Sequence, residues 1–97
     1  VAPDAVVARS VLGPGVRVDA GAAVRGSVLM AGAHVGEGAV IERAILGNRA
    51  VVGPRARVDD VAVLGDDSSV GPDLRVSGGS LGVGEHLELS PAHIEEV

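Results

Sequence analysis

The chain has 97 residues, with 13 acidic and 8 basic side chains, a formal net charge of −5 and a pI near 5.0. This acidic balance disfavours nucleic acids and anionic membranes as partners, because both attract basic surfaces. The absence of cysteine excludes disulfides, thiolate metal sites and cysteine nucleophiles, and it fits a reducing compartment. With no apolar run long enough for a membrane span and no signal peptide before the repeat described next, we expect one soluble, cytoplasmic domain.

An aliphatic residue returns every six positions, or occasionally five, from the first residue to Leu87. Neither a helix, with a period of about 3.6, nor a single amphipathic strand, with a period of about two, produces this spacing. Grouped in threes, the segments give three columns with a constant spacing, which is longer by one position at a single step in each column. The columns are Leu12, Leu29, Leu46, Leu64 and Leu81; Val1, Val18, Val35, Val52, Val70 and Leu87; and Val7, Val24, Ile41, Val58 and Val76. The repeat predicts an all-β fold, a parallel β-helix of about five triangular coils around an aliphatic lumen.

One side of the predicted prism is shorter than the other two. Its segments begin at Val7, Val24, Ile41 and Val76 and have five residues each, whereas the segment that begins at Val58 has six. We therefore expect a prism that is trimmed along one edge. The position four after each aliphatic is small or apolar, and we expect these residues to fill the inner corners. They are Val16, Ala22, Val28, Ala33, Ala39, Ile45, Ala50, Ala56, Ala62, Ser68, Leu74 and Ser80.

Turn residues follow the aliphatic positions at regular places. In Pro14-Gly15, proline presets φ near about −65° and glycine accepts a positive φ, as a type II turn requires. The pairs with glycine in the same place are Ala20-Gly21, Ala31-Gly32, Glu37-Gly38 and Gly78-Gly79. Four residues occupy this place without being glycine, namely Arg49, Arg55, Asp67 and Asp73. We expect those corners to be strained or to use another turn type.

The repeat defines the expected domain limits. Residues 1–87 form the β-helix, and residues 88–97, where the register fails, form a C-terminal cap or tail over the open strand edges. Val1 is already in register and nothing in the sequence covers the first coil. We therefore expect the chain to be the end of a longer protein.

Three histidines are the first candidates for chemistry. His34 and His86 share a column but lie three coils apart, which is about 14 Å along the axis at the usual strand spacing. Zinc ligands lie only about 2.0–2.1 Å from the metal, so these two cannot share an ion within one subunit. His93 belongs to the tail. We interpret all three as exposed turn or cap residues, and a metal ligand or general base remains the alternative.

Acidic residues offer a second candidate. Asp59, Asp60, Asp66 and Asp67 are expected near corners, where a solvated face explains them, and a cation site over one corner region is the alternative. We assign no catalytic, cofactor-binding or metal-binding residue in this chain.

Several segments resemble the C-terminal β-helix of sugar-1-phosphate nucleotidylyltransferases. Residues 10–18, 27–32 and 35–41 are similar to ADP-glucose pyrophosphorylases and to the GDP-mannose enzymes. The following run most resembles mannose-1-phosphate guanylyltransferases, including the longer segment at 58–63. It comprises 45–48, 52–53, 56–58, 63–67, 73–74 and 78–79. The resemblance covers roughly residues 5–87, and it departs at 82–84, where that family often has Leu-Pro-His.

The resemblance implies a left-handed β-helix and a parent enzyme that joins a sugar 1-phosphate to a nucleoside triphosphate, with release of pyrophosphate and help from Mg²⁺. The glycine-rich signature and metal-binding aspartate of that family belong to an N-terminal Rossmann-like domain, so no catalytic residue carries over and the fragment alone is not an enzyme. The implied partners are that N-terminal domain of the same chain and further copies in a homo-oligomer, with regulation in some members.

Two alternatives remain open from the sequence. The first is a stand-alone hexapeptide-repeat acyltransferase, although such enzymes use a histidine and often a loop extruded from the coil, and no such loop is present here. The second is a scaffold without enzymatic activity. A nucleotide-binding glycine signature upstream of Val1 would support the nucleotidylyltransferase, and a Met just before Val1 would support the acyltransferase.

Overall fold

The computed structural model describes residues 3–87, which form fifteen short β-strands and no helix. The proposed C-terminal cap at 88–97 lies outside the described residues. The strands are β1 (Val6–Ala8), β2 (Val11–Leu12), β3 (Arg17–Val18), β4 (Ala23–Arg25), β5 (Val28–Leu29), β6 (His34–Val35), β7 (Val40–Glu42), β8 (Ile45–Leu46), β9 (Val51–Val52), β10 (Arg57–Asp59), β11 (Val63–Leu64), β12 (Ser69–Val70), β13 (Arg75–Ser77), β14 (Ser80–Leu81) and β15 (His86–Leu87). Three consecutive strands make one coil, so that coil 1 contains β1 to β3 and coil 5 contains β13 to β15.

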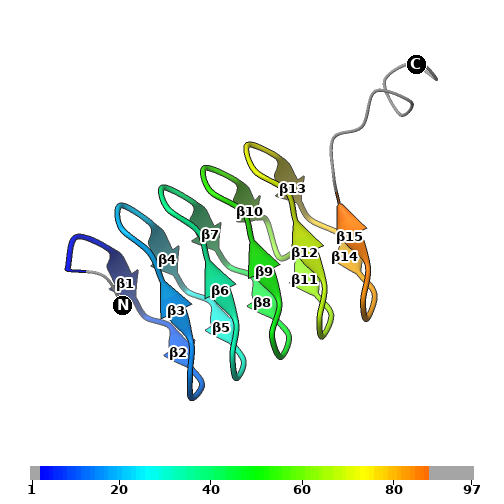
Figure 1. Cartoon of the computed structure of the whole chain (residues 1–97), viewed down its shortest axis with the longest axis horizontal. Coiled ribbons are helices and arrows are strands. Elements are labelled where there is room, and N and C mark those ends of the chain that lie inside the picture. Colours follow the sequence, from blue (N-terminus) through cyan, green and yellow to red (C-terminus); the bar gives the residue numbers. More distant parts are fainter. Residues whose placement is uncertain (1–2, 88–97) are drawn as a thin grey trace.

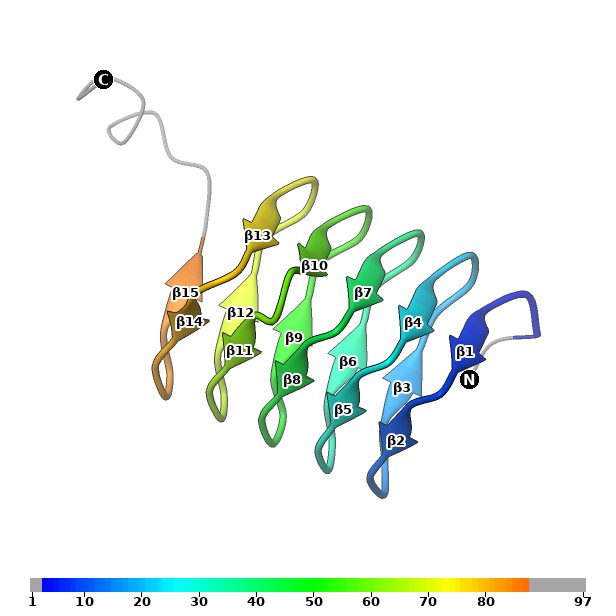
Figure 2. The same cartoon turned by 180° about the vertical axis from the view of Figure 1, so that it is seen from behind.

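Every third strand joins the same sheet, and all pairs are parallel. Sheet A contains β1, β4, β7, β10 and β13, sheet B contains β2, β5, β8, β11 and β14, and sheet C contains β3, β6, β9, β12 and β15. Leu12 pairs with Leu29 in the next coil, and Leu46 pairs with Leu64 across the longer step of the repeat. The coils therefore lie side by side along one axis, as Figures 1 and 2 show from opposite sides. The predicted all-β fold, a parallel β-helix of about five three-sided coils, is confirmed.

The column residues fill the lumen between the three sheets. Leu29, Val35 and Leu46 are fully buried, whereas Leu12 and Leu87 in the end coils are only partly buried. Full burial of an aliphatic side chain of this size contributes about 1.5–3 kcal/mol, so the central coils supply most of the stabilisation. The narrow lumen accounts for a core made of valine, leucine, isoleucine and alanine, in a chain that has no aromatic residue.

The corner between sheets B and C uses one left-handed residue in every coil. The residues and their φ angles are Gly15 (72°), Gly32 (73°), Arg49 (60°), Asp67 (59°) and Gly84 (72°). Arg55 and Asp73 occupy the same kind of place at the corner between sheets C and A, with φ of 60° and 61°. The expectation of strain at the four corners without glycine is confirmed, because a side chain costs energy in this region.

The corner between sheets A and B is the trimmed edge, and here one prediction was wrong. Val28, Ile45 and Ser80 do not fill inner corners; they lie on the outer face of sheet B, and Ile45 is 43% exposed. Because this side has one residue fewer, the inner corner moves to the residue before, which is Ser27 in coil 2 and Ala44 in coil 3. The prediction that the residue four after the aliphatic fills the inner corner is confirmed at Ala62, where this side has six residues.

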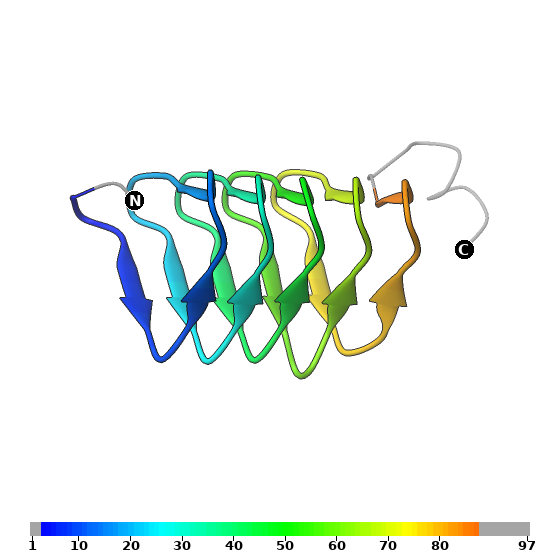
Figure 3. The same ribbon diagram turned by 90° about the horizontal axis from the view of Figure 1, so that it is seen from below.

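The extra residue of coil 4 lies at this same A/B corner. Asp60 and Val61 both have left-handed φ, at 60° and 62°, and the tip of the corner projects further than in the other coils (Figure 3). Asp59 loses its register with Glu42, since β10 pairs with β7 only at Arg57 and Val58. The insertion is thereby absorbed in one turn, and sheets B and C continue in register beyond it.

Candidate functional site

His34 lies on the outer face of sheet C beside an aspartate. Its Nε2 is 2.8 Å from Oδ2 of Asp19, and Oδ1 of Asp19 accepts a hydrogen bond from Nε of Arg17 at 3.1 Å. The hydrogen bond with His34, followed by that with Arg17, holds the pKa of Asp19 below its usual value despite some desolvation. The pair resembles the histidine and carboxylate of many general-base sites, but no nucleophile lies beside it among the described contacts.

His86 is far from His34 on the same sheet. Strands β9 and β12 separate them, and Nδ1 of His86 contacts Oγ of Ser69 at 2.6 Å. The prediction that the two histidines share a column without meeting is confirmed. His93 lies outside the described residues.

The four aspartates are divided between two corners. Asp59 and Asp60 belong to the A/B corner, whereas Asp66 and Asp67 follow β11 at the B/C corner. Asp66 accepts a hydrogen bond from the Asn48 backbone at 2.7 Å, and Asp67 binds an arginine. The alternative of one cation site over a single corner is therefore wrong, and residues 3–87 contain no group of three histidine or carboxylate side chains that could hold a metal ion.

Arginine and carboxylate side chains form ladders across neighbouring coils. At the B/C corner, Nε and Nη2 of Arg49 donate to the two oxygens of Asp67 at 2.7 and 2.9 Å. Arg55 and Asp73 repeat this arrangement at the C/A corner, at 2.7 and 3.1 Å. In both pairs the arginine hydrogen bonds lower the pKa of the aspartate. Each bidentate pair joins two strained left-handed residues in adjacent coils.

A longer ladder runs over sheet A. Glu42 accepts hydrogen bonds from Nη1 of Arg25 at 3.4 Å and from Nη2 of Arg57 at 2.9 Å. Arg57 also donates from Nε to Asp59 at 2.6 Å, and Arg75 approaches the same carboxylate oxygen at 3.5 Å. The Asp59 side chain is only 7% exposed, and the hydrogen bond from Arg57 is the main reason that its pKa is lowered.

These ladders were missed in the sequence, although a signal exists. Arg25 and Glu42, like Arg49 and Asp67, are opposite charges one coil apart, at the same sequence separation as neighbours in a lumen column. The ladders stabilise the stacking of coils, and nothing in them brings reacting groups together around an open space.

The outer face of sheet B is mainly apolar, in contrast with the other two sheets. Val11, Ile45 and Val63 are 64%, 43% and 39% exposed, and Val28 between them is half-buried. A hollow of about 420 Å³ runs over this face. It is lined by Gly26, Val28, Arg43, Ala44, Ile45, Val61, Ala62 and Val63. An aliphatic stripe of this kind on a flat sheet is typical of a surface that packs against protein.

Three parallel sheets closed by sides of six residues, or five along the trimmed edge, around an aliphatic lumen define a hexapeptide-repeat β-helix protein. Within that class, the chain belongs to the GMPPB C-terminal domain family, whose model matches residues 1–91. A comparison with curated proteins gives no match. Over the described residues, the structure has no helix long and apolar enough to cross a membrane.

Solved structures with a similar coil include acetyltransferases. One is a mutant of the GDP-perosamine N-acetyl transferase from Caulobacter crescentus with CoA and GDP-perosamine, at 28% identity and a TM-score of 0.70 over 87% of this chain. Another is the acetyltransferase domain of PglB from Neisseria gonorrhoeae FA1090 with acetyl coenzyme A, at 24% identity and a TM-score of 0.67, also over 87%. The chain spans about half the length of each, 50% and 51% respectively, and the second likeness concerns the fold alone.

Proposed function

We propose that this chain is the C-terminal assembly domain of a sugar-1-phosphate nucleotidylyltransferase, most like a mannose-1-phosphate guanylyltransferase. The observation that carries the proposal is the family match over residues 1–91, which spans all five coils of the β-helix, including the one enlarged corner in coil 4. The sequence before Val1 tests the proposal. A glycine-rich nucleotide-binding signature there is the expected result, and a different enzyme domain there would contradict it.

Catalysis in the proposed parent enzyme belongs to its N-terminal domain. That domain would bind the sugar 1-phosphate and the nucleoside triphosphate, and Mg²⁺ would neutralise phosphate charge during pyrophosphate release. The carboxylates described above fit no such ion, because Glu42, Asp59, Asp67 and Asp73 are engaged by arginines. We therefore expect the 97-residue chain alone to release no pyrophosphate from a nucleoside triphosphate and a sugar 1-phosphate, and steady turnover would contradict this. The absence of cysteine agrees with a cytoplasmic enzyme.

The role proposed for the β-helix is to hold subunits together through the outer face of sheet B. Its outer stripe presents β-branched side chains at nearly constant spacing in coils 1 to 4, where Val11, Val28, Ile45 and Val63 pair in sequence. Such a rigid, flat and apolar face suits a contact with another copy in a symmetric oligomer.

Matched substitutions on two sheets test this role in the complete polypeptide. Ile45→Glu places a charge on sheet B, and Val51→Glu places one on sheet C, where Val51 is 38% exposed. We expect Ile45→Glu to reduce the molecular mass measured by sedimentation and Val51→Glu to leave it unchanged. Equal effects of the two variants, or none from either, would contradict a contact through sheet B.

A second candidate function is acetyl transfer to an amino sugar. The likeness to the Caulobacter acetyltransferase favours it, together with the His34 and Asp19 pair on sheet C. The test is an acetyl-CoA consumption assay with amino sugars linked to nucleotides. Activity that His34→Ala abolishes while the fold remains intact would establish this function instead of the first.

A further inference from the structure

Two arginines of the chain have no carboxylate partner in the part that the structure describes. Six of the eight arginines make ion pairs, from Arg17 in coil 1 to Arg75 in coil 5. The exceptions are Arg9 and Arg43, although the chain carries an excess of acidic residues. Both lie at the A/B corner, in coils 1 and 3.

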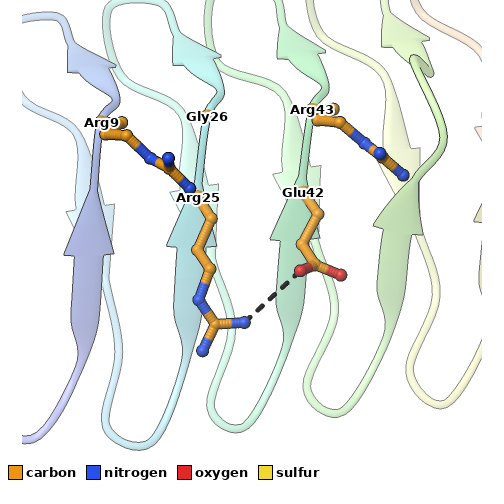
Figure 4. A pocket seen from close by; sticks show the side chains of 5 residues that line it. All are labelled: Arg9, Arg25, Gly26, Glu42 and Arg43. Carbon is orange, nitrogen blue, oxygen red and sulfur yellow. Dashed lines mark hydrogen bonds and ion pairs between the residues drawn. The ribbon is translucent and has the colours of Figure 1, made fainter.

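The residue between these two arginines has no side chain. Gly26 occupies the corresponding place in coil 2, and Arg9, Gly26 and Arg43 have φ of 49°, 57° and 49°. A hollow of about 250 Å³ opens over this glycine, and Arg9, Arg25, Gly26, Glu42 and Arg43 line it. Figure 4 shows the Arg9 side chain reaching along the rod toward Gly26, while Arg43 borders the far edge and extends toward coil 4.

The charge around the hollow is positive. Glu42 is its one acidic lining residue, and hydrogen bonds from Arg25 and Arg57 already occupy both of its oxygens, at 3.4 and 2.9 Å. Three arginines therefore line the hollow beside one engaged carboxylate, and two of the three have no ion pair in the described residues.

The backbone gives an independent reason to ask what the two arginines do. A residue with a side chain is disfavoured at positive φ, and coils 2 and 5 use Gly26 and Gly78 at this place. Arg49 and Arg55 are also strained, but each makes a bidentate pair with the next coil. Arg9 and Arg43 have the same kind of strain without that compensation. Backbone strain that nothing in the fold offsets is a feature of ligand sites.

We propose that the hollow formed by Arg9, Arg25, Gly26, Glu42 and Arg43, here called the A/B hollow, binds a small multivalent oxyanion of the phosphate class. The planar guanidinium group donates two parallel hydrogen bonds to such oxygens, and the absence of a Cβ at Gly26 leaves room for the anion against the backbone. Arg9 and Arg25 would contact the anion directly, and Arg43, which borders the hollow from coil 3, would add positive charge at its far edge. The acidic remainder of the chain favours a small ligand over a nucleic acid or a membrane.

Titration with sodium pyrophosphate, inorganic phosphate and a sugar 1-phosphate, each against sodium chloride of equal ionic strength, tests the proposal. Calorimetry gives the affinity, and the NMR shift of the Gly26 amide reports the place. We expect saturable binding of at least one phosphate compound with a shift at Gly26, and the strongest of the three identifies the source of the phosphate. Shifts that chloride reproduces, or saturable binding that leaves Gly26 unmoved, would overturn the proposal.

Glycine variants separate binding from folding. Arg9→Gly is expected to weaken binding about tenfold or more, because a direct charged contact is lost, and Arg43→Gly by about threefold, because only a charge at the far edge is lost. Both should fold, because glycine suits the positive φ at these positions. Arg49→Gly is the matched control, since it removes the same charge at the same kind of corner position and should leave the affinity unchanged. If Arg49→Gly weakens binding as much as Arg9→Gly, the effect is one of net charge and the A/B hollow is not the site.

Discussion

The A/B and B/C corners border the same sheet but arrange charge in opposite ways. At the B/C corner, Arg49 and Asp67 follow each other in adjacent coils and make a bidentate pair. At the A/B corner, Arg9 and Arg43 are separated by Gly26 and make no ion pair among the described residues, although Glu42 lines the same hollow. Both corners place side chains at positive φ, so the comparison shows that strain can either be offset within the stack or leave charged groups free for a ligand.

The lumen is common to both corners, and its loss should have the largest effect. Leu46→Asp buries a charge with no partner in a fully buried position, which costs more than about 4 kcal/mol and should abolish folding. Circular dichroism melting measures this. The neighbouring Ile45→Asp, whose side chain lies outside, is the control and should retain the fold. A normal melting curve for Leu46→Asp would contradict the structure of the core.

Two buried serines sharpen the difference between the corners. Ser27 at the A/B corner donates to the Arg25 carbonyl at 2.9 Å and accepts from the Ala44 amide at 3.1 Å. Ser27→Ala leaves the buried Ala44 amide without a partner, whereas the Arg25 carbonyl still accepts from the Arg43 amide at 2.9 Å, and the loss should cost about 1–3 kcal/mol. Ser68→Ala at the B/C corner loses only the bond to the Gly65 carbonyl and should cost less. Urea denaturation of the two variants measures the difference, and a larger cost at Ser68 would be inconsistent with this account.

Glycine at the left-handed positions tests the strain itself. Arg9→Gly and Arg43→Gly should raise the free energy of unfolding slightly, by up to about 1 kcal/mol, because no ion pair is lost and a strained backbone is relieved. Arg49→Gly also relieves strain but loses its two hydrogen bonds to Asp67, so its melting temperature should rise less or fall. The melting temperatures should also be measured at high salt, where exposed ion pairs weaken. There the melting temperature of Arg49→Gly should lie closer to those of Arg9→Gly and Arg43→Gly.

The smallest expected effect is the pH dependence of stability that comes from the aspartates paired with arginine at the B/C and C/A corners. The pKa of Asp67 and Asp73 is lowered from 3.8 by hydrogen bonds from Arg49 and Arg55. A lowered pKa in the folded state means that the contribution is complete above the unfolded pKa and is lost as the pH falls through the folded value. We expect melting temperatures to be level above about pH 5 and to decrease below about pH 4. Asp67→Asn should flatten that decrease, whereas Asp60→Asn, which makes no ion pair in the described part of the chain, should not.

The lumen could be predicted from the sequence because one spacing determines it. Every coil repeats the same three inward positions, so Leu29 and Leu46 could be placed one above the other without knowing any contact. The inner corner at the trimmed edge could not be placed by the same rule. Because this side is one residue shorter, the inward-facing residue is Ala44 and not Ile45. The sequence alone does not show which residue of a shortened side faces inward.

The A/B hollow could not be predicted either, for a different reason. Arg9, Gly26 and Arg43 follow one another at the constant spacing of the lumen columns, but this alignment does not show that an open hollow lies over Gly26, because that depends on where the arginine side chains extend. Arg49 and Arg43 each have an aspartate one coil further along, Asp67 and Asp60, yet of the two only Arg49 makes an ion pair in the described residues. The spacing in the sequence does not distinguish the two cases.

The shared register of the three sheets makes the coils interchangeable units. From coil 1 to coil 3, each strand residue lies above its counterpart in the next coil, and each coil contacts mainly the coils beside it. Length is therefore an additive property of this molecule, and the segment that makes one coil could be duplicated or removed in evolution without a new core having to be invented. The enlarged turn of coil 4 is the exception to that modularity, because its extra residue distinguishes this coil from the other four.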